Sequence, residues 1–88
     1  MNPEHLKKLK EGVAQFNAWR KETKERPDLS SADLQEMNLT EANLSGANLN
    51  GANLQLAKLN AAKLQGADLR NASLQRAELI LARIPKLN

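Results

Sequence analysis

Leucine recurs at every fifth position through the second part of this chain, in an unbroken series of twelve that isoleucine completes. An alanine lies two positions before ten of the twelve, and the residue between them is mostly Asn or Asp. The repeat therefore has the form Ala-Asn/Asp-Leu followed by two mostly polar residues. A regular repeat of this length is typical of a protein built from stacked structural units. The members of the series are Leu29, Leu34, Leu39, Leu44, Leu49, Leu54, Leu59, Leu64, Leu69, Leu74, Leu79 and Ile84.

A period of five residues fits neither regular secondary structure. On a helix, successive leucines would be rotated by about 140°, so no apolar stripe would form. On one continuous strand, the odd spacing would direct successive leucines to opposite faces. The chain must therefore turn once per repeat, with each Ala-x-Leu triplet extended and its first and third side chains pointing inward. Corners of one hand wind such a chain into a solenoid whose structural core is the leucine series.

The stretch ANLSGANLNGANL, residues 42–54, resembles the pentapeptide-repeat family almost letter for letter. The resemblance covers residues 27–84 and implies an all-β solenoid, namely a right-handed quadrilateral parallel β-helix with one quintet per side. Twelve quintets would then form about three coils. The periodicity by itself requires turns and an inward face, but it does not choose four sides over three. The string FNAWRK, residues 16–21, is also similar to N-terminal segments of bacterial, especially cyanobacterial, members.

Glycine occupies the second position after the leucine in three quintets, as Gly46, Gly51 and Gly66. A type II turn needs positive φ at that position, so the glycines predict type II corners, and Asn71 can serve likewise. Six further residues at that position predict a different turn type: Glu36, Glu41, Leu56, Ala61, Arg76 and Leu81.

Residues 1–26 are organised differently and are predicted to be an amphipathic capping helix with its linker. Apolar residues recur there at spacings of three and four from Leu6 to Trp19, which favours one helix from Pro3 to about Lys24, bent at Gly12 if it bends. A solenoid needs an end cap because its first coil otherwise leaves core and backbone open. The residues predicted to cover the first coil are Leu9, Val13, Phe16 and Trp19.

The other end has no second helix, and residues 85–88 form only a short tail. Positions 80 and 81, polar or small in most other quintets, become apolar just as the coils finish. We therefore expect this end to be covered by another copy, in a homodimer through the C-terminal coil, or by a further segment. The candidate interface residues are Ile80, Leu81, Ile84 and Leu87, together with Leu56 on the side of the solenoid.

The sequence predicts no catalytic, cofactor-binding or metal-binding residues, and hence no enzyme. His5 is the only histidine, so a triad or zinc site lacks partners, and we interpret it as structural. Asp28, Asn48 and Asp68 would share one outward column, but Ca²⁺ needs six to eight converging oxygens. A hydrogen-bonding ladder along the outward Asn column is the favoured interpretation.

Charge and composition indicate which partners are excluded and where in the cell the protein is expected. The formal charge of +3 belongs wholly to residues 1–26, since the rest of the chain holds six acidic and six basic residues. A neutral body is a poor nucleic-acid-binding groove, and glutamates between the lysines argue against a membrane surface. No signal-like or membrane-spanning stretch occurs and cysteine is absent, so a cytoplasmic location is expected.

The favoured function is a non-catalytic protein-interaction or scaffold module with an unknown protein partner. The resemblance implies an alternative, because some longer family members resemble DNA and bind type II topoisomerases as inhibitors or protectors. About three coils and a neutral solenoid are a poor match to a long, negatively charged duplex.

Overall fold

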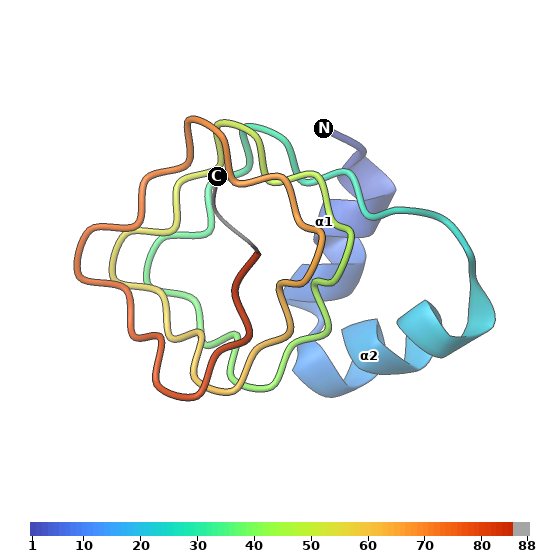
Figure 1. The fold of residues 1–88 in the computed structure, drawn as a ribbon. Coiled ribbons are helices and arrows are strands. Elements are labelled where there is room, and N and C mark those ends of the chain that lie inside the picture. Colours follow the sequence, from blue (N-terminus) through green and yellow to red (C-terminus); the bar gives the residue numbers. More distant parts are fainter. Residues whose placement is uncertain (86–88) are drawn as a thin grey trace.

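The computed structural model describes residues 1–85 and consists of two short helices followed by a stack of coils (Figure 1). Helix α1 spans Pro3–Lys10 and helix α2 spans Val13–Glu22. From Asp28 onward the chain forms isolated parallel β-bridges in place of continuous strands. The result is a β-helix solenoid. Among the described residues, no helix is both long and apolar enough to cross a membrane.

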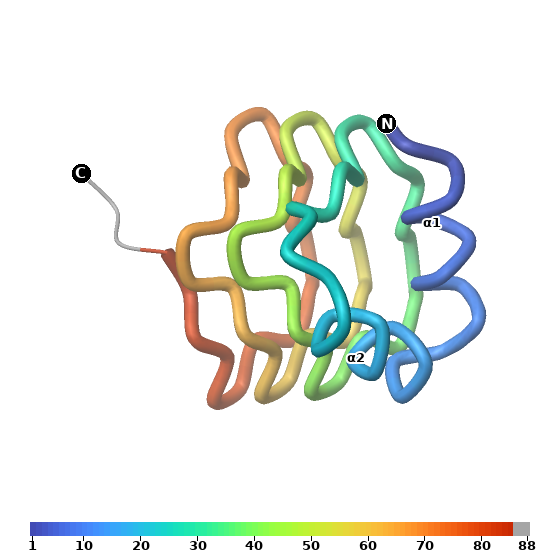
Figure 2. The backbone as a smooth tube through the Cα atoms, turned by 90° about the vertical axis from the view of Figure 1, so that its right-hand side faces the viewer, coloured from blue at the N-terminus to red at the C-terminus, as the bar shows by residue number. Residues whose placement is uncertain are grey.

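Every β-bridge joins residues twenty positions apart, so each coil takes four quintets. Asn48 pairs with Asp28 on one side and with Asp68 on the other. The Leu29 N–H donates to the Asn48 carbonyl at 2.8 Å, and the Asn48 N–H donates to the Pro27 carbonyl at 2.8 Å. We call residues 27–46 the first coil, 47–66 the second coil and 67–85 the third coil. Figure 2 shows these coils stacked side by side, with α1 beyond the first coil.

All the corners between residues 29 and 82 use the same turn, which the sequence did not predict. At each one the N–H of the fourth residue donates to the carbonyl of the leucine, as from Ala57 to Leu54 at 3.1 Å. The third residue has positive φ whatever its type: 62° at Leu56, 59° at Ala61 and 70° at Gly46. The prediction of another turn type at non-glycine corners is therefore wrong. Coils that hydrogen-bond in register require one common corner, and this requirement overrides local preference.

These left-handed corners carry a testable cost. A left-handed conformation costs an ordinary residue about 1–2 kcal/mol, partly offset by the greater unfolded-state entropy of glycine. Ala61→Gly should therefore raise the free energy of unfolding by about 0.5–1 kcal/mol. Gly46→Ala should lower it by a similar amount, because a Cβ at Gly46 meets nothing within 4 Å and only the backbone is strained. Urea denaturation of both variants measures the two changes, and equal shifts of the same sign would contradict the argument.

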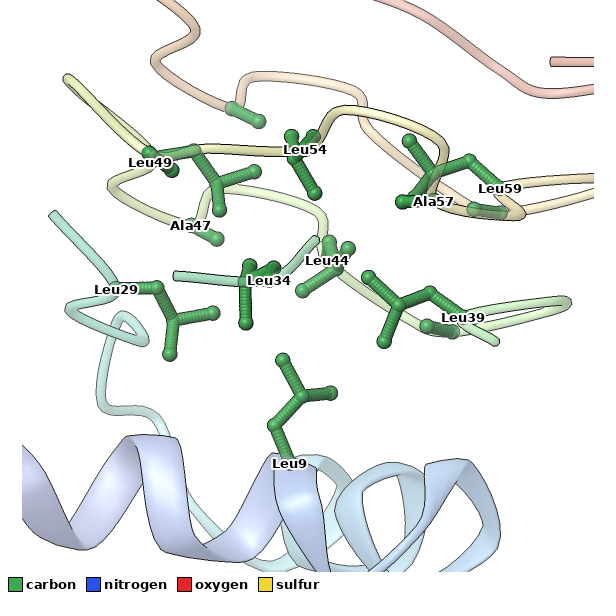
Figure 3. Packing of buried hydrophobic residues seen from close by; sticks show 14 of the residues in the cluster. Leu9, Leu29, Leu34, Leu39, Leu44, Ala47, Leu49, Leu54, Ala57 and Leu59 are labelled. Atoms are coloured by element: carbon green, nitrogen blue, oxygen red, sulfur yellow. The ribbon is translucent and has the colours of Figure 1, made fainter. Parts of the chain in front are cut away.

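The core is a stack of inward leucines separated by alanines (Figure 3). The eight leucines of the series from Leu29 to Leu64 are all 0% exposed. Leu69 and Leu74 are only partly buried, while Leu79 is 38% and Ile84 54% exposed. Each fully buried leucine contributes roughly 1.5–3 kcal/mol before entropy is subtracted. The first two coils therefore hold most of the enclosed core, and within residues 1–85 nothing covers the outer side of the third coil.

The N-terminal segment forms two helices, in place of the single helix that the sequence favoured. Gly12 lies between them with φ 121° and ψ 154°, a conformation that only glycine adopts readily and that breaks the helix. Asn2 caps α1 by accepting from the Glu4 N–H at 2.9 Å. The break lets both helices turn a side chain into the first coil: Leu9 is 1% and Phe16 0% exposed. Figure 3 shows Leu9 pointing from its helix toward the leucines.

Val13 and Trp19, also predicted to cover the first coil, are partly buried against the core. The Trp19 ring packs between His5, at 4.9 Å between centroids, and Phe16, at 5.7 Å. Lys8 Nζ lies 5.5 Å from the Trp19 ring centroid. Phe16 therefore fills the space over the leucines, and Trp19 joins α1 to α2 outside it.

Candidate interaction surfaces

The two helices contact the first coil through side chains that take the place of a preceding coil. The Asn17 amide donates to the Glu41 carbonyl at 3.0 Å and accepts from the Asn43 N–H at 2.8 Å. In the second coil the equivalent N–H, of Lys63, donates to the Ala42 carbonyl at 3.0 Å. One asparagine side chain thus satisfies a group that a preceding strand would otherwise pair.

At the first quintet, His5 and Asn2 likewise pair with backbone groups that a preceding coil would otherwise bind. The Asp28 N–H donates to His5 Nδ1 at 2.9 Å, and the Asn2 N–H donates to the Asp28 carbonyl at 3.0 Å. Because Nδ1 accepts, the ring proton lies on Nε2, which is 2.9 Å from Glu25 Oε2. Both ring nitrogens of this buried histidine are therefore engaged in holding the chain together, as expected of a structural residue.

Two arginines fasten the segment after α2 to the fourth side of the first coil. Arg20 donates to the carbonyls of Ser45 and Glu25, and Arg26 Nε donates to the Gly46 carbonyl. Partial burial lowers the pKa of Arg20 from its usual value by desolvation. The role of these arginines could not be predicted from the sequence, because their acceptors are backbone carbonyls that only the folded coil brings near.

Removing the His5 side chain should weaken the attachment of α1 to the first coil. His5→Ala leaves the Asp28 N–H without its acceptor in a partly buried site, and we expect a loss of about 2 kcal/mol in the free energy of unfolding. Lys10→Ala, an exposed change at the end of the same helix, should cost much less. Thermal unfolding of the two variants provides the comparison, and equal midpoints would show that His5 does not fasten the helix.

The outward Asn and Asp side chains bond within their own coil and do not form the ladder expected from the sequence. Each oxygen accepts from the N–H two residues on, as in Asn48 from Asn50 at 3.0 Å and Asn53 from Gln55 at 3.1 Å. This local bond explains why the middle position favours Asn and Asp. A ladder between coils does exist, but two positions after the middle residue, from Gln35 through Gln55 to Gln75 at 2.9 and 3.4 Å.

The carboxylates of the first outward column are also engaged locally. Hydrogen bonds from Ser30 lower the pKa of Asp28. Hydrogen bonds from Arg70, with its charge at 2.8 Å, lower the pKa of Asp68 well below its usual range. Each group faces its own corner, so their oxygens do not converge. Within residues 1–85, no three His, Asp or Glu side chains are placed to hold a metal ion.

The outer edge of the third coil is open. In the second coil the Leu54 N–H donates to the Ser73 carbonyl at 2.8 Å, but within residues 1–85 the equivalent N–H groups of Leu74 and Leu79 have no backbone acceptor. Ile80 is 70% and Leu81 83% exposed beside this edge. Leu87, the remaining residue of the predicted end interface, lies outside the described residues. An apolar floor and unpaired backbone groups thus occur together at one end of the molecule.

Leu56 is the other exposed leucine of the candidate interface, at 46% exposure on the side of the second coil. Its corner has φ 62°, so a bulky apolar residue stands where glycine would be most stable. Glu36 and Arg76 occupy the same corner of the neighbouring coils.

These features define a repeat solenoid with polar sides, with helices in contact with its first coil and, within residues 1–85, no chain paired to the outer edge of its third coil. The family model for pentapeptide repeats matches eight copies over residues 28–64 and 52–84. The chain therefore belongs to the pentapeptide-repeat family, as the repeat pattern predicted.

Two solved structures are similar to the chain. One is a pentapeptide repeat protein (Rfr23) from the cyanobacterium Cyanothece 51142, at 43% identity and TM-score 0.64, covering 69% of this chain. The chain spans only 41% of that protein. The other is alr5209, a pentapeptide repeat protein from Nostoc Pcc 7120, at 30% identity over 73% of this chain and 74% of that one, with TM-score 0.26. No curated protein matches the chain.

Proposed function

We propose that this chain is a non-catalytic protein-interaction module whose open third coil binds a second copy of itself. In this proposal the solenoid is a right-handed, four-sided β-helix of three coils, α1 and α2 cap its first coil, and it works in the cytoplasm. The observation that carries the proposal is the coincidence of exposed Leu79, Ile80, Leu81 and Ile84 with an edge whose backbone groups have no partner within residues 1–85. Such an edge promotes pairing with another chain unless something covers it.

A second copy fits this end because it brings the same apolar floor and the same backbone groups. Two third coils meeting about a two-fold axis would bury Leu79 and Ile84 against their counterparts. Ile80 and Leu81, at the corner beside them, would add apolar contact at the rim. Leu56 lies away from this end and offers a separate contact on the side of the solenoid.

The test is self-association of a double variant. Ile80→Lys with Leu81→Lys should dissociate the dimer while keeping the circular dichroism spectrum, because both side chains are exposed in the single copy. Ala61→Lys with Gln65→Lys is the matched control, since it adds the same charge at exposed positions of the second coil. Light scattering measures the mass, and a wild-type monomer at high micromolar concentration would refute the dimer.

The alternative of a DNA-like topoisomerase ligand finds no support in the charge distribution. The four acidic residues of the first coil lie beside the basic N-terminal segment, and the second coil carries Lys58 and Lys63 with no acidic residue. A supercoiling assay with a type II topoisomerase separates the two functions: an interaction module should leave the rate unchanged.

A further inference from the structure

Charge is segregated along the solenoid, although residues 27–88 hold equal numbers of acidic and basic residues. The first coil carries four carboxylates and no Lys or Arg: Asp28, Asp33, Glu36 and Glu41. The described part of the third coil carries more basic than acidic residues: Arg70, Arg76 and Arg83 against Asp68 and Glu78. The two ends of the stack are therefore electrostatically complementary to each other. Two third coils carry like net charges, so the proposed dimer depends on apolar contact and backbone pairing and gains nothing from net charge.

The backbone groups at the two ends are complementary as well. Between the second and third coils, the Ser73 N–H donates to the Ala52 carbonyl at 2.9 Å, while the Leu54 N–H donates to the Ser73 carbonyl. At the outer edge of the third coil, the Ala72 carbonyl and Leu74 N–H repeat the arrangement of Ala52 and Leu54 with no partner within residues 1–85. At the start of the first coil, the equivalent of Ser73 is Asp33. The third coil of one copy can thus pair with the first coil of another as one coil pairs with the next.

The N-terminal segment, residues 1–26, covers part of the edge of the first coil. Residues 1–26, which carry seven basic and four acidic residues, lie against the acidic first coil. Their hydrogen bonds reach only the first quintet, through Asn2 and His5, and the stretch from Glu41 to Gly46, through Asn17, Arg20 and Arg26. Within residues 1–85 the N–H groups of Asp33 and Asn38 have no hydrogen-bond acceptor. Side chains of the N-terminal segment therefore pair with the backbone on two sides of the first coil. On the other two sides, which contain Asp33 and Asn38, the backbone N–H groups remain unpaired within the described part of the chain.

We infer that the edge of the first coil is a binding surface for the third coil of a second copy, and that the N-terminal helices block it. Leu9 and Phe16 fill the end of the core, so a second copy cannot stack while the helices are docked. A tethered segment competes at a high effective concentration, which keeps the surface closed. Release of the helices would permit head-to-tail stacking, in which the third coil of one copy binds the first coil of the next. Because the two surfaces differ and the stack does not form a closed ring, the assembly would grow into filaments. The inference rests on the third coil being a binding surface, as proposed above.

A cross-link between two single-cysteine copies tests the stacking, because the chain has no cysteine of its own. One copy carries Asp33→Cys and the other Ser73→Cys. In a head-to-tail stack these positions would be bridged neighbours like Asn53 and Ser73, at the coil spacing of about 4.8 Å that permits a disulfide. Both copies also carry the releasing changes His5→Ala, Asn17→Ala and Arg20→Ala. The matched control carries Lys10→Ala, Gln15→Ala and Lys21→Ala, exposed changes on the same two helices.

Treated with an added mild oxidant that accepts the two thiol electrons, the released pair should form the 33–73 disulfide. The released copies should also sediment as species whose mean mass keeps rising with concentration. The control pair should form no such link. Adding Arg76→Glu and Arg83→Glu to the released copies should abolish the link. A link that formed through aggregation of unfolded chains would persist after these charge reversals. If the triple change unfolds the chain, Asn17→Ala alone is used in its place. The yield of the 33–73 disulfide should then be lower than expected for the triple change but still higher than with the control Gln15→Ala.

The outcomes separate this inference from the proposed dimer. A dimeric wild type together with released copies that give no 33–73 link overturns the inference and leaves the dimer standing. A monomeric wild type together with released copies that do give the link overturns the dimer and leaves the inference standing. A 33–73 link in the control pair would show that the helices do not block the surface.

Discussion

Leu59→Asp should unfold the protein at room temperature. Leu59 is 0% exposed in the second coil, where its neighbours are leucines and alanines and no cation or hydrogen-bond donor side chain faces inward. The change removes a buried leucine and places an unpaired carboxylate in the core, so we expect a loss of at least about 5 kcal/mol. That is comparable to the whole stability of a small domain. Circular dichroism during urea denaturation measures the loss.

Asn53→Asp is the matched control for this prediction. Asn53 is in the same coil, points outward and uses its side-chain oxygen to accept the Gln55 N–H at 3.1 Å. An aspartate keeps that acceptor, so the midpoint of unfolding should hardly move. Equal stability of the two variants would overturn the inward assignment of the leucines.

Deletion of residues 1–24 should convert the protein into an aggregating species. It removes Leu9 and Phe16, whose burial contributes roughly 1.5–3 kcal/mol each, and uncovers the leucines of the first coil. It also exposes the Asp28 and Asn43 N–H groups that His5 and Asn17 now satisfy. Both effects favour association, and size-exclusion chromatography with light scattering measures it.

The paired variant Leu9→Ala with Phe16→Ala separates the two contributions to capping. It removes the apolar cover but keeps the hydrogen bonds of His5 and Asn17, so it should lose stability with less aggregation than the deletion. A truncated protein that stays monomeric and as stable as the full chain would show that the helices are no cap.

The sequence predicted which side chains of each quintet point inward, because that depends only on their spacing within the quintet. The Ala-x-Leu spacing puts two apolar side chains on one face, and Leu29 to Leu64 are all buried there. The family could also be identified from the repeat alone. The choice of four sides came only from the family resemblance, since neighbours such as Asp28 and Asn48 are twenty residues apart.

Where the structure differs from the sequence-based predictions, neighbouring coils or the edge of the first coil override local preferences. Glu36 and Leu56 adopt positive φ because they occupy the same corner of neighbouring coils, and these coils must stay in register. Gly12 breaks the N-terminal helix so that both halves can reach the leucines. The roles of Asn17 and Arg20 could not be predicted, because they bind backbone groups more than twenty residues away.

By itself, then, the sequence determined the turning chain, its inward leucines, its family and the different character of residues 1–26. Those features follow from side-chain spacing over a few residues, which local sterics and hydrophobicity convert directly into structure. Only the tertiary structure decided the common corner, the side chains that substitute for a preceding coil, and the acidic first coil beneath a basic segment. These depend on which residues the twenty-residue coil brings together, and hydrogen bonds and charges act only between groups that the fold has placed within reach.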